Sequence, residues 1–252
     1  FRDLLFFLTR RSSDLRVARA FDVSMVVSVV EKELFLERIP DVEPAVVPNG
    51  VDVDHFTSAG NVQREPQSEV FTGVMDYEPN VDGVLWFVRE SWPKIRTAYP
   101  DAKFLVVGSK PCPEIQALHG KDGIEVTGRV PEIPPYLDRA AVAVAPLRLA
   151  RGVQNKVLEA MSMGLPVAST PQAAQGIGAN SAGSRPLCVV EDMAQMTDAV
   201  LTWFGDATAA RTSGEHAAAY VREHFQWSVM HQRFQEAWQP LVDARGQQLS
   251  GR

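Results

Sequence analysis

The chain has 252 residues, of which 45% are apolar and 22% charged, and its formal net charge is −6. This length allows one or two globular domains, and the acidic balance argues against nucleic-acid binding, which uses basic surfaces. No apolar run approaches the ~20 residues needed to cross a bilayer. Cys112 and Cys188 lie too far apart for a metal motif or a disulfide framework, which favours reduced thiols and a cytoplasmic protein.

Residues 1–56 are predicted to alternate between helix and strand. We expect a helix over 4–21, a buried strand over 23–30, a helix over 30–39 and a strand in 44–52 that ends at Pro48-Asn49-Gly50. Two strands cannot bury both faces of a parallel sheet, so this part is interpreted as the remnant of an N-terminal domain with further strands upstream of Phe1.

The first 20 residues carry five Arg against two Asp. A basic helix of this kind can dock on anionic lipids at the inner face of a membrane. The alternative is a solvated face of the N-terminal domain, and both interpretations stay open.

Residues 57–69 are polar and rich in Gly, Pro and Ser, as is typical of a linker. A second domain is predicted over 70–240, with a flexible tail at 241–252. Its expected strands are 69–75, 103–109, 123–128, 141–147, 165–170 and 186–191. Its expected helices are 80–100, 153–164 ending at Gly164, and three more after Asp192. This alternation predicts an α/β fold with a doubly wound parallel sheet, that is, a Rossmann-like domain.

Ligands of such sheets bind outside the carboxyl ends of the strands, so the loop after 141–147 is the first candidate site. Gly152 lets the backbone approach a ligand, and the free amide groups at the start of the next helix favour an anion such as a diphosphate. Arg151 and Lys156 can pair with phosphate, and Glu159 shares a helix face with Lys156 and can accept hydrogen bonds from a ribose diol. The alternative is an ordinary exposed Lys–Glu pair.

Two further loops follow predicted strands. Asp76 is suited equally to ligand binding and to a local role, whereas Asn80, preceded by Pro79, is predicted to cap a helix. Gly128 allows a sharp turn, after which Arg129 faces either a nucleotide or solvent.

A metal site is not predicted. Asp52 and Asp54 have the spacing of a metal–nucleotide site but follow an Asn-Gly turn, and the five histidines lack ligand spacing (His55, His119, His216, His224 and His231).

Several segments, taken in order, resemble a known family. VVPNGVDVDHF, FTGVMDYEPNVDGVLWF, FLVVGS, VTGRV and above all KVLEAMSMGLPVAST resemble the second half of a GT-B glycosyltransferase of glycosyltransferase family 4. The GVMDYEPN variant is similar to the sugar transferases of bacterial exopolysaccharide systems associated with exosortases and PEP-CTERM proteins. The resemblance covers roughly residues 20–240 and implies a retaining enzyme that uses a nucleotide-sugar donor.

The resemblance also implies roles for individual residues. Glu159 matches the second Glu of the family's Glu-x7-Glu motif, which binds the donor ribose, whereas the first Glu is replaced by Arg151. Met75 and Asp76 occupy the place of a basic phosphate-binding residue, so Arg151 and Lys156 are expected to compensate and to act catalytically on the leaving diphosphate. The complete set of expected donor-binding residues is Asp76, Gly128, Arg129, Val130, Gly152, Val153, Lys156 and Glu159.

The resemblance therefore predicts a metal-independent hexosyltransferase without a cofactor, acting on a glycan or a lipid-linked acceptor in bacterial polysaccharide synthesis. Two alternatives remain. The chain is a non-catalytic nucleotide-sugar-binding fragment, since most of the acceptor domain is absent from the sequence, or it is a sugar epimerase of similar fold.

Overall fold

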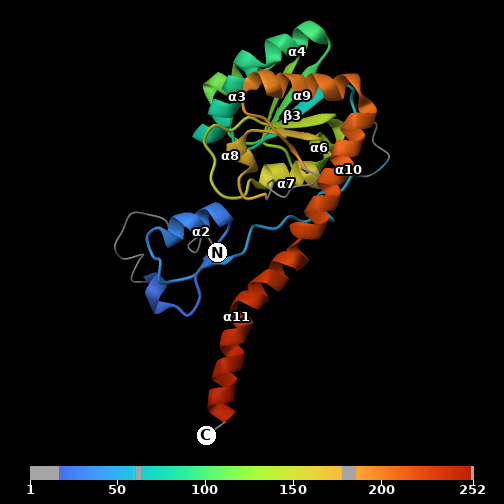
Figure 1. Ribbon diagram of the computed structural model, residues 1–252. Coiled ribbons are helices and arrows are strands. Elements are labelled where there is room, and N and C mark those ends of the chain that lie inside the picture. Colours follow the sequence, from blue (N-terminus) through green and yellow to red (C-terminus); the bar gives the residue numbers. More distant parts are fainter. Residues whose placement is uncertain (1–16, 59, 61–63, 178–185, 251–252) are drawn as a thin grey trace.

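The computed structural model describes residues 17–58, 60, 64–177 and 186–250, with side chains up to residue 243. The chain forms a large lobe and a small N-terminal lobe, with a long C-terminal helix running past the small lobe (Figure 1). Among these residues, no helix is long and apolar enough to cross a membrane.

The large lobe is built on a six-stranded parallel sheet with the order β5-β4-β3-β6-β7-β8. Its strands are β3 (Ser68–Thr72), β4 (Lys103–Val107), β5 (Ile124–Gly128), β6 (Val142–Ala145), β7 (Val167–Ser169) and β8 (Cys188–Val189). The doubly wound sheet expected from the sequence is therefore confirmed, and each strand lies within a predicted segment, apart from Ser68. The strand order switches from one side of β3 to the other between β5 and β6. Ligands of doubly wound sheets bind at such a switch point, so we call the region at the carboxyl ends of β3 and β6 the crevice.

Helices cover both faces of this sheet (Figure 1), with α3, α4 and α9 on one side and α7 and α10 on the other. The helices of the large lobe are α3 (Glu78–Glu90), α4 (Trp92–Ala98), α5 (Pro113–Gln116), α6 (Pro134–Arg139), α7 (Asn155–Ser162), α8 (Pro171–Ala174), α9 (Met193–Gly205) and α10 (Ala207–His224), followed by α11 (Trp227–Ser250).

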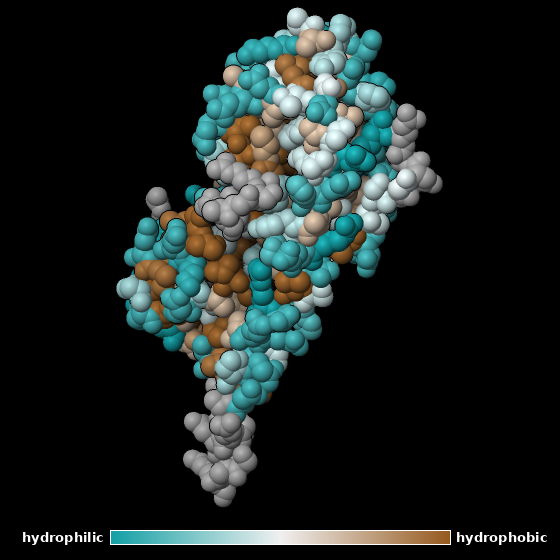
Figure 2. Space-filling model, turned by 45° about the vertical axis from the view of Figure 1, so that its right-hand side comes forward, coloured by the Kyte–Doolittle hydropathy of each residue, from teal (hydrophilic) through white to brown (hydrophobic). Residues whose placement is uncertain are grey.

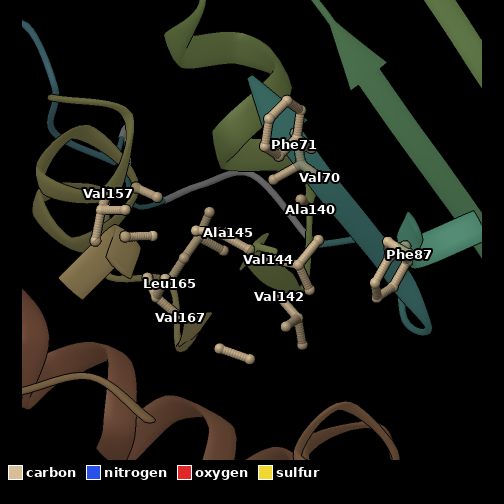
Figure 3. Close-up of a cluster of buried hydrophobic side chains, with 14 of the residues drawn as sticks. Val70, Phe71, Phe87, Ala140, Val142, Val144, Ala145, Val157, Leu165 and Val167 are labelled. Atoms are coloured by element: carbon tan, nitrogen blue, oxygen red, sulfur yellow. The ribbon is translucent and has the colours of Figure 1, made fainter. Parts of the chain in front are cut away.

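The core follows from strands that are apolar on both faces. Phe104 to Val107 of β4 are fully buried, as expected of a central parallel strand covered by helices on each side. Figure 3 shows Val70 and Phe71 of β3 close to Val144 and Ala145 of β6. The two strands that border the crevice are thus anchored in one continuous core.

The small lobe contains β1 (Met25–Val26), α2 (Val29–Leu36) and β2 (Ala45–Val46), and it has its own hydrophobic cluster. The predicted strand over 23–30 is too long, because Ser28 accepts a hydrogen bond from Glu31 N and caps α2, so that Val29 and Val30 are helical. The two strands pair in parallel. The basic segment over 1–20 lies outside the described residues except for 17–20, which are helical.

At three further places the structure adds to or differs from the sequence expectations. The helix predicted over 80–100 is two helices separated at Ser91, because Pro93 has no backbone N–H to continue the ladder. The short helices α5, α6 and α8 were not predicted, and each begins with proline. Residues 241–250 of the predicted flexible tail are helical and continue α11.

The two lobes meet along a boundary with apolar surface, which Figure 2 shows in brown. Val51 N donates to Phe225 O at 2.8 Å, and a Cβ on Gly50 would lie 2.9 Å from the Trp227 ring. The start of α11 therefore packs directly against the segment that leads out of the small lobe.

Candidate functional site

Helix α7 is fixed at its carboxyl end, which sets the position of its functional side chains. Gly164 has φ +69, and Leu165 N donates to Ala160 O (3.1 Å) while Gly164 N donates to Met161 O (2.9 Å). These two bonds form a Schellman motif, which favours glycine at this left-handed position. Arg64 also donates to the carbonyls of Met163 and Gly164 at 2.8 and 2.9 Å. The helix end predicted at Gly164 is thus confirmed.

At the other end of α7, the first turn lies at the switch point. Gln154 precedes the helix, but its side-chain amide donates to Arg151 O at 3.0 Å and does not cap the helix. The first amide groups of α7 therefore receive no side-chain cap, which leaves a local positive potential beside the crevice.

Lys156 lies over the carboxyl ends of β3 and β6 and is partly buried. Its side chain lines a small void together with Thr72 and Ala145. Its Nζ donates to Asn80 Oδ1 at 2.5 Å and lies 4.4 Å from the centroid of the Phe71 ring. Burial disfavours the ammonium and lowers the pKa of Lys156 from 10.5 to about 8, while the carboxylate of Glu159 opposes this shift. The structure thus places a cation where the crevice would receive an anion.

Glu159 lies one turn further along α7 and is also partly buried. Burial raises the pKa of Glu159, whereas the positive charges of Lys156 and His55 act in the opposite direction. The alternative interpretation, an ordinary exposed Lys–Glu pair, is therefore wrong, because both side chains are partly buried. The sequence alone shows no ligand spacing for His55, but the fold brings this histidine close enough to act electrostatically on the Glu159 carboxylate.

Arg151, Gly152 and Val153 occupy the loop before α7 and have different environments. Arg151 is exposed, and within the described part of the chain its guanidinium forms no ion pair. Gly152 has φ +65, and a Cβ there would lie 3.2 Å from Val27 Cγ2 of the small lobe. Val153 is buried in the core. Glycine is thus needed here for the turn and for contact with the small lobe.

The structure does not bring the other predicted site residues into contact with Lys156. Gly128 ends β5 with φ +68, which confirms the sharp turn. Arg129 is exposed, and Val130 packs partly against the core. Asp76 is exposed, with Oδ2 3.5 Å from Lys110 Nζ. These residues border the same edge of the sheet, but their ligand contacts stay a prediction.

Asn80 contacts Lys156 in the structure, whereas the sequence predicted that it caps a helix. The cap residue of α3 is Tyr77, so the prediction that Asn80 caps the helix is wrong. Asn80 lies within the first turn, is buried, and its Nδ2 donates to Val74 O at 2.9 Å while its Oδ1 accepts from Lys156. The Pro79 that precedes it was the usable signal, because proline is accepted inside the first helical turn and places the cap further back.

The loops after β3 and β4 are joined backbone to backbone beside this cluster. Gly73 N donates to Val107 O at 3.0 Å, and Met75 N donates to Ser109 O at 2.8 Å. A Cβ on Gly108, where φ is +149, would lie 1.7 Å from Gly73 O. No side chain fits at this contact, so glycine at position 108 allows the loops after β3 and β4 to pack together beside the crevice.

The aspartates with metal-like spacing have a local role. Asp52 Oδ1 accepts hydrogen bonds from the backbone N–H groups of Asp54 (3.1 Å) and His55 (3.0 Å). Asp52 therefore stabilises the turn that carries His55. Among the residues that the structure describes, no group of three or more His, Cys, Asp or Glu side chains is placed to hold a metal ion.

Several solved structures have a similar fold. Sucrose-phosphate synthase from Thermosynechococcus elongatus is 19% identical, with a TM-score of 0.71 over 94% of this chain and 63% of that protein. HepE of Anabaena in complex with UDP is 14% identical, with a TM-score of 0.72 over 93% of this chain and 70% of that protein. A glycosyltransferase from Rickettsia africae is 15% identical, with a TM-score of 0.70 over 92% of this chain and 65% of that protein. At these identities the similarity shows the fold, which is of the GT-B type.

The chain spans 63% of the length of the sucrose-phosphate synthase structure and 45% of that of TarM, a further similar structure. Among curated protein sequences, no significant match is found. The sequence profile described as "Glycosyl transferases group 1" matches residues 66–206, which is more than half of the chain and contains the whole crevice at β3 and β6. The chain therefore belongs to the group 1 glycosyl transferases.

Proposed function

We propose that this chain binds the nucleotide-diphosphate donor of a glycosyltransferase and that the crevice between β3 and β6 is the donor site. The observation that carries the proposal is that a partly buried cation, Lys156, and a partly buried carboxylate, Glu159, lie one turn apart on α7 at this switch point and act on each other electrostatically. The family match and the similar structure that holds UDP support a nucleotide as the ligand.

In this proposal, each group meets the part of the donor that suits its charge. The diphosphate lies at the start of α7, where Lys156 Nζ and the amide groups face the negative charge, and Arg151 reaches it from the preceding loop. The ribose hydroxyls donate to Glu159. Gly128, Arg129 and Val130 lie beside the base, and Asp76 borders the sugar.

The chemical step follows from where charge develops. The bond between the anomeric carbon and the β-phosphate oxygen breaks, and its electron pair stays on the diphosphate. The hydroxyl oxygen of the acceptor forms the new bond, and its proton passes to solvent. Lys156 and Arg151 stabilise the charge that grows on the leaving diphosphate, so the proposed step uses cations of the chain itself, without a metal or cofactor.

The finer assignment rests on the resemblance of the sequence motifs. We propose a retaining hexosyltransferase of glycosyltransferase family 4, of the exosortase-associated type, that acts in the cytoplasm on a glycan or lipid-linked acceptor of bacterial polysaccharide synthesis. Arg151 stands where the family has a glutamate that contacts the donor sugar. The donor of this chain is therefore expected to differ in how its sugar is held, because a cation replaces a hydrogen-bond acceptor.

A ligand screen tests the proposal. UDP-, GDP- and ADP-sugars are compared by thermal shift, and the nucleotide that stabilises the chain is then titrated by calorimetry. We expect K156A and E159A each to weaken its binding more than tenfold. The matched control is K103A, because Lys103 pairs with Glu65 at the opposite end of the sheet.

The outcomes separate the proposal from its alternatives. The donor site is contradicted if none of the three nucleotide classes binds, or if K156A and E159A both bind the nucleotide as tightly as the unaltered protein does. Binding without donor hydrolysis or transfer favours a non-catalytic binding module. Conversion of the donor sugar to an epimer in the absence of acceptor identifies the epimerase alternative.

A further inference from the structure

Lys156 is held in place by a residue from a distant part of the sequence. Asn80 belongs to α3 and is 5% exposed. Its two side-chain polar atoms form different hydrogen bonds: Nδ2 donates to Val74 O at 2.9 Å, and Oδ1 accepts from Lys156 Nζ at 2.5 Å. Only the carbonyl oxygen of the amide can accept from the ammonium, so the bond to Val74 fixes the amide in the orientation that presents this oxygen.

The remaining surroundings of the ammonium also confine it. A Cβ on Gly73 would lie 2.7 Å from Asn80 Nδ2 and 3.0 Å from Lys156 Nζ. Glycine at this position therefore makes room for the contact between α3 and α7. The ring of Phe71 lies on another side, 4.4 Å from Nζ at its centroid, and attracts the cation.

We infer that Asn80 is a positioning residue, which holds the Lys156 ammonium at the carboxyl end of β3 so that it meets the diphosphate of a nucleotide donor. This inference rests on the proposed function. Asn80 itself acts through Lys156. Gly73 permits this contact because it has no side chain between Asn80 and Lys156. A long, mobile lysine side chain is thereby restricted before the ligand arrives, which reduces the entropy lost on binding.

The charges around Lys156 determine how this role is measured. Glu159, on the same helix, acts electrostatically on Lys156, and His55 acts in the same way on Glu159. The groups that α3 and β3 place against the ammonium, Asn80 and Phe71, are neutral. Burial lowers the pKa of Lys156 to about 8. The affinity for a diphosphate should therefore fall as the pH rises above about 8, by up to about tenfold for each pH unit.

Substitutions of Asn80 should move this decline in opposite directions. N80A removes the oxygen that stabilises the ammonium, so the pKa of Lys156 falls further and the loss of affinity begins at a lower pH. N80D keeps the shape of the side chain and places a negative charge beside the ammonium, so the loss begins at a higher pH, although the added charge weakens binding at every pH. A merely structural role for Asn80 would not produce shifts of opposite sign.

The test is calorimetric titration into the full chain, from pH 6.5 to 9.5, of whichever of UDP, GDP and ADP the unaltered protein binds most tightly. The unaltered protein, N80A, N80D and K156M are compared, with E78Q as the control because Glu78 is exposed in the same turn of α3. We expect the decline to begin in the order N80A, unaltered protein, N80D as the pH rises. E78Q should follow the unaltered protein, and K156M should bind weakly with no such decline.

Other outcomes contradict either the role of Asn80 or the proposed function. If N80A and N80D decline at the same pH as the unaltered protein while K156M binds weakly, the donor site stands and the role of Asn80 is wrong. If both variants shift in the same direction, the role is also wrong. If the unaltered protein binds none of UDP, GDP and ADP, the proposed function fails, and this inference fails with it. Thermal denaturation of each variant identifies any loss of folding, and N80D, which has nearly the same shape, keeps the comparison decisive.

Discussion

Replacing Lys156 by methionine tests the cost of holding a cation in this crevice. Burial lowers the pKa of Lys156 from 10.5 to about 8 in the folded chain. Between these pH values the unfolded chain binds a proton that the folded chain has released, so the free energy of unfolding rises with pH by about 1.4 kcal/mol per pH unit. K156M lacks this contribution. Relative to K156M, the unaltered protein should therefore gain about 2 kcal/mol between pH 8 and pH 9.5.

Urea denaturation of both proteins at several pH values measures this difference. The cost of the buried charge is fully present below the folded-state pKa of about 8, falls steadily as the pH rises above that value, and is gone only above the ordinary pKa of 10.5. A pH-dependent difference also separates this cost from the loss of the hydrogen bond to Asn80, which lowers the stability of K156M at every pH. A constant difference from pH 7 to pH 9.5 would refute the reasoning. K103M provides the control, because the Lys103 ammonium is exposed and the difference should then stay constant.

Three further predictions concern other parts of the large lobe. E159Q should weaken UDP binding about tenfold in calorimetry, because an amide accepts hydrogen bonds from a ribose diol less strongly than a carboxylate does; unchanged affinity would remove Glu159 from the site. G108A should fail to fold or lose several kcal/mol in urea denaturation, because its Cβ would lie 1.7 Å from Gly73 O, and a stability equal to that of the unaltered protein would contradict this contact. Burial raises the pKa of Glu69, and within the described residues its carboxylate oxygens have no hydrogen-bond partner. E69L should therefore raise the free energy of unfolding by about 1–3 kcal/mol at pH 7, and this gain should shrink as the pH falls toward the ordinary pKa of the carboxyl group; a pH-independent gain would contradict the assignment to charge burial.

The sequence predicted the sheet well because its evidence is local. Each strand of the large lobe is a short apolar run between turn residues, and strict alternation with helices leaves a parallel, doubly wound sheet as the expected arrangement. That Lys156 and Glu159 lie on the same side of α7 was also predictable, because residues three apart share a helix face. Strand ends were less predictable: Val29 and Val30 continue an apolar run but belong to a helix that Ser28 caps.

The parts of the site that were missed depend on contacts between distant residues. Asn80 and Lys156 lie 76 positions apart, and no local pattern connects a residue at the start of one helix with a lysine on another. The same applies to His55, which a turn and the linker bring near Glu159. Burial of Lys156 was equally hidden, since a lysine three residues before a glutamate on a helix is most often an exposed pair.

The central claim is that a nucleoside diphosphate binds at the carboxyl ends of β3 and β6, against the first turn of α7. A crystal structure of the chain with the nucleotide that gives the largest thermal shift tests it most directly. The account predicts a phosphate oxygen within hydrogen-bond distance of Lys156 Nζ and the ribose hydroxyls at the Glu159 carboxylate. A nucleotide bound elsewhere on the chain, with Lys156 and Glu159 both out of its reach, would contradict the claim.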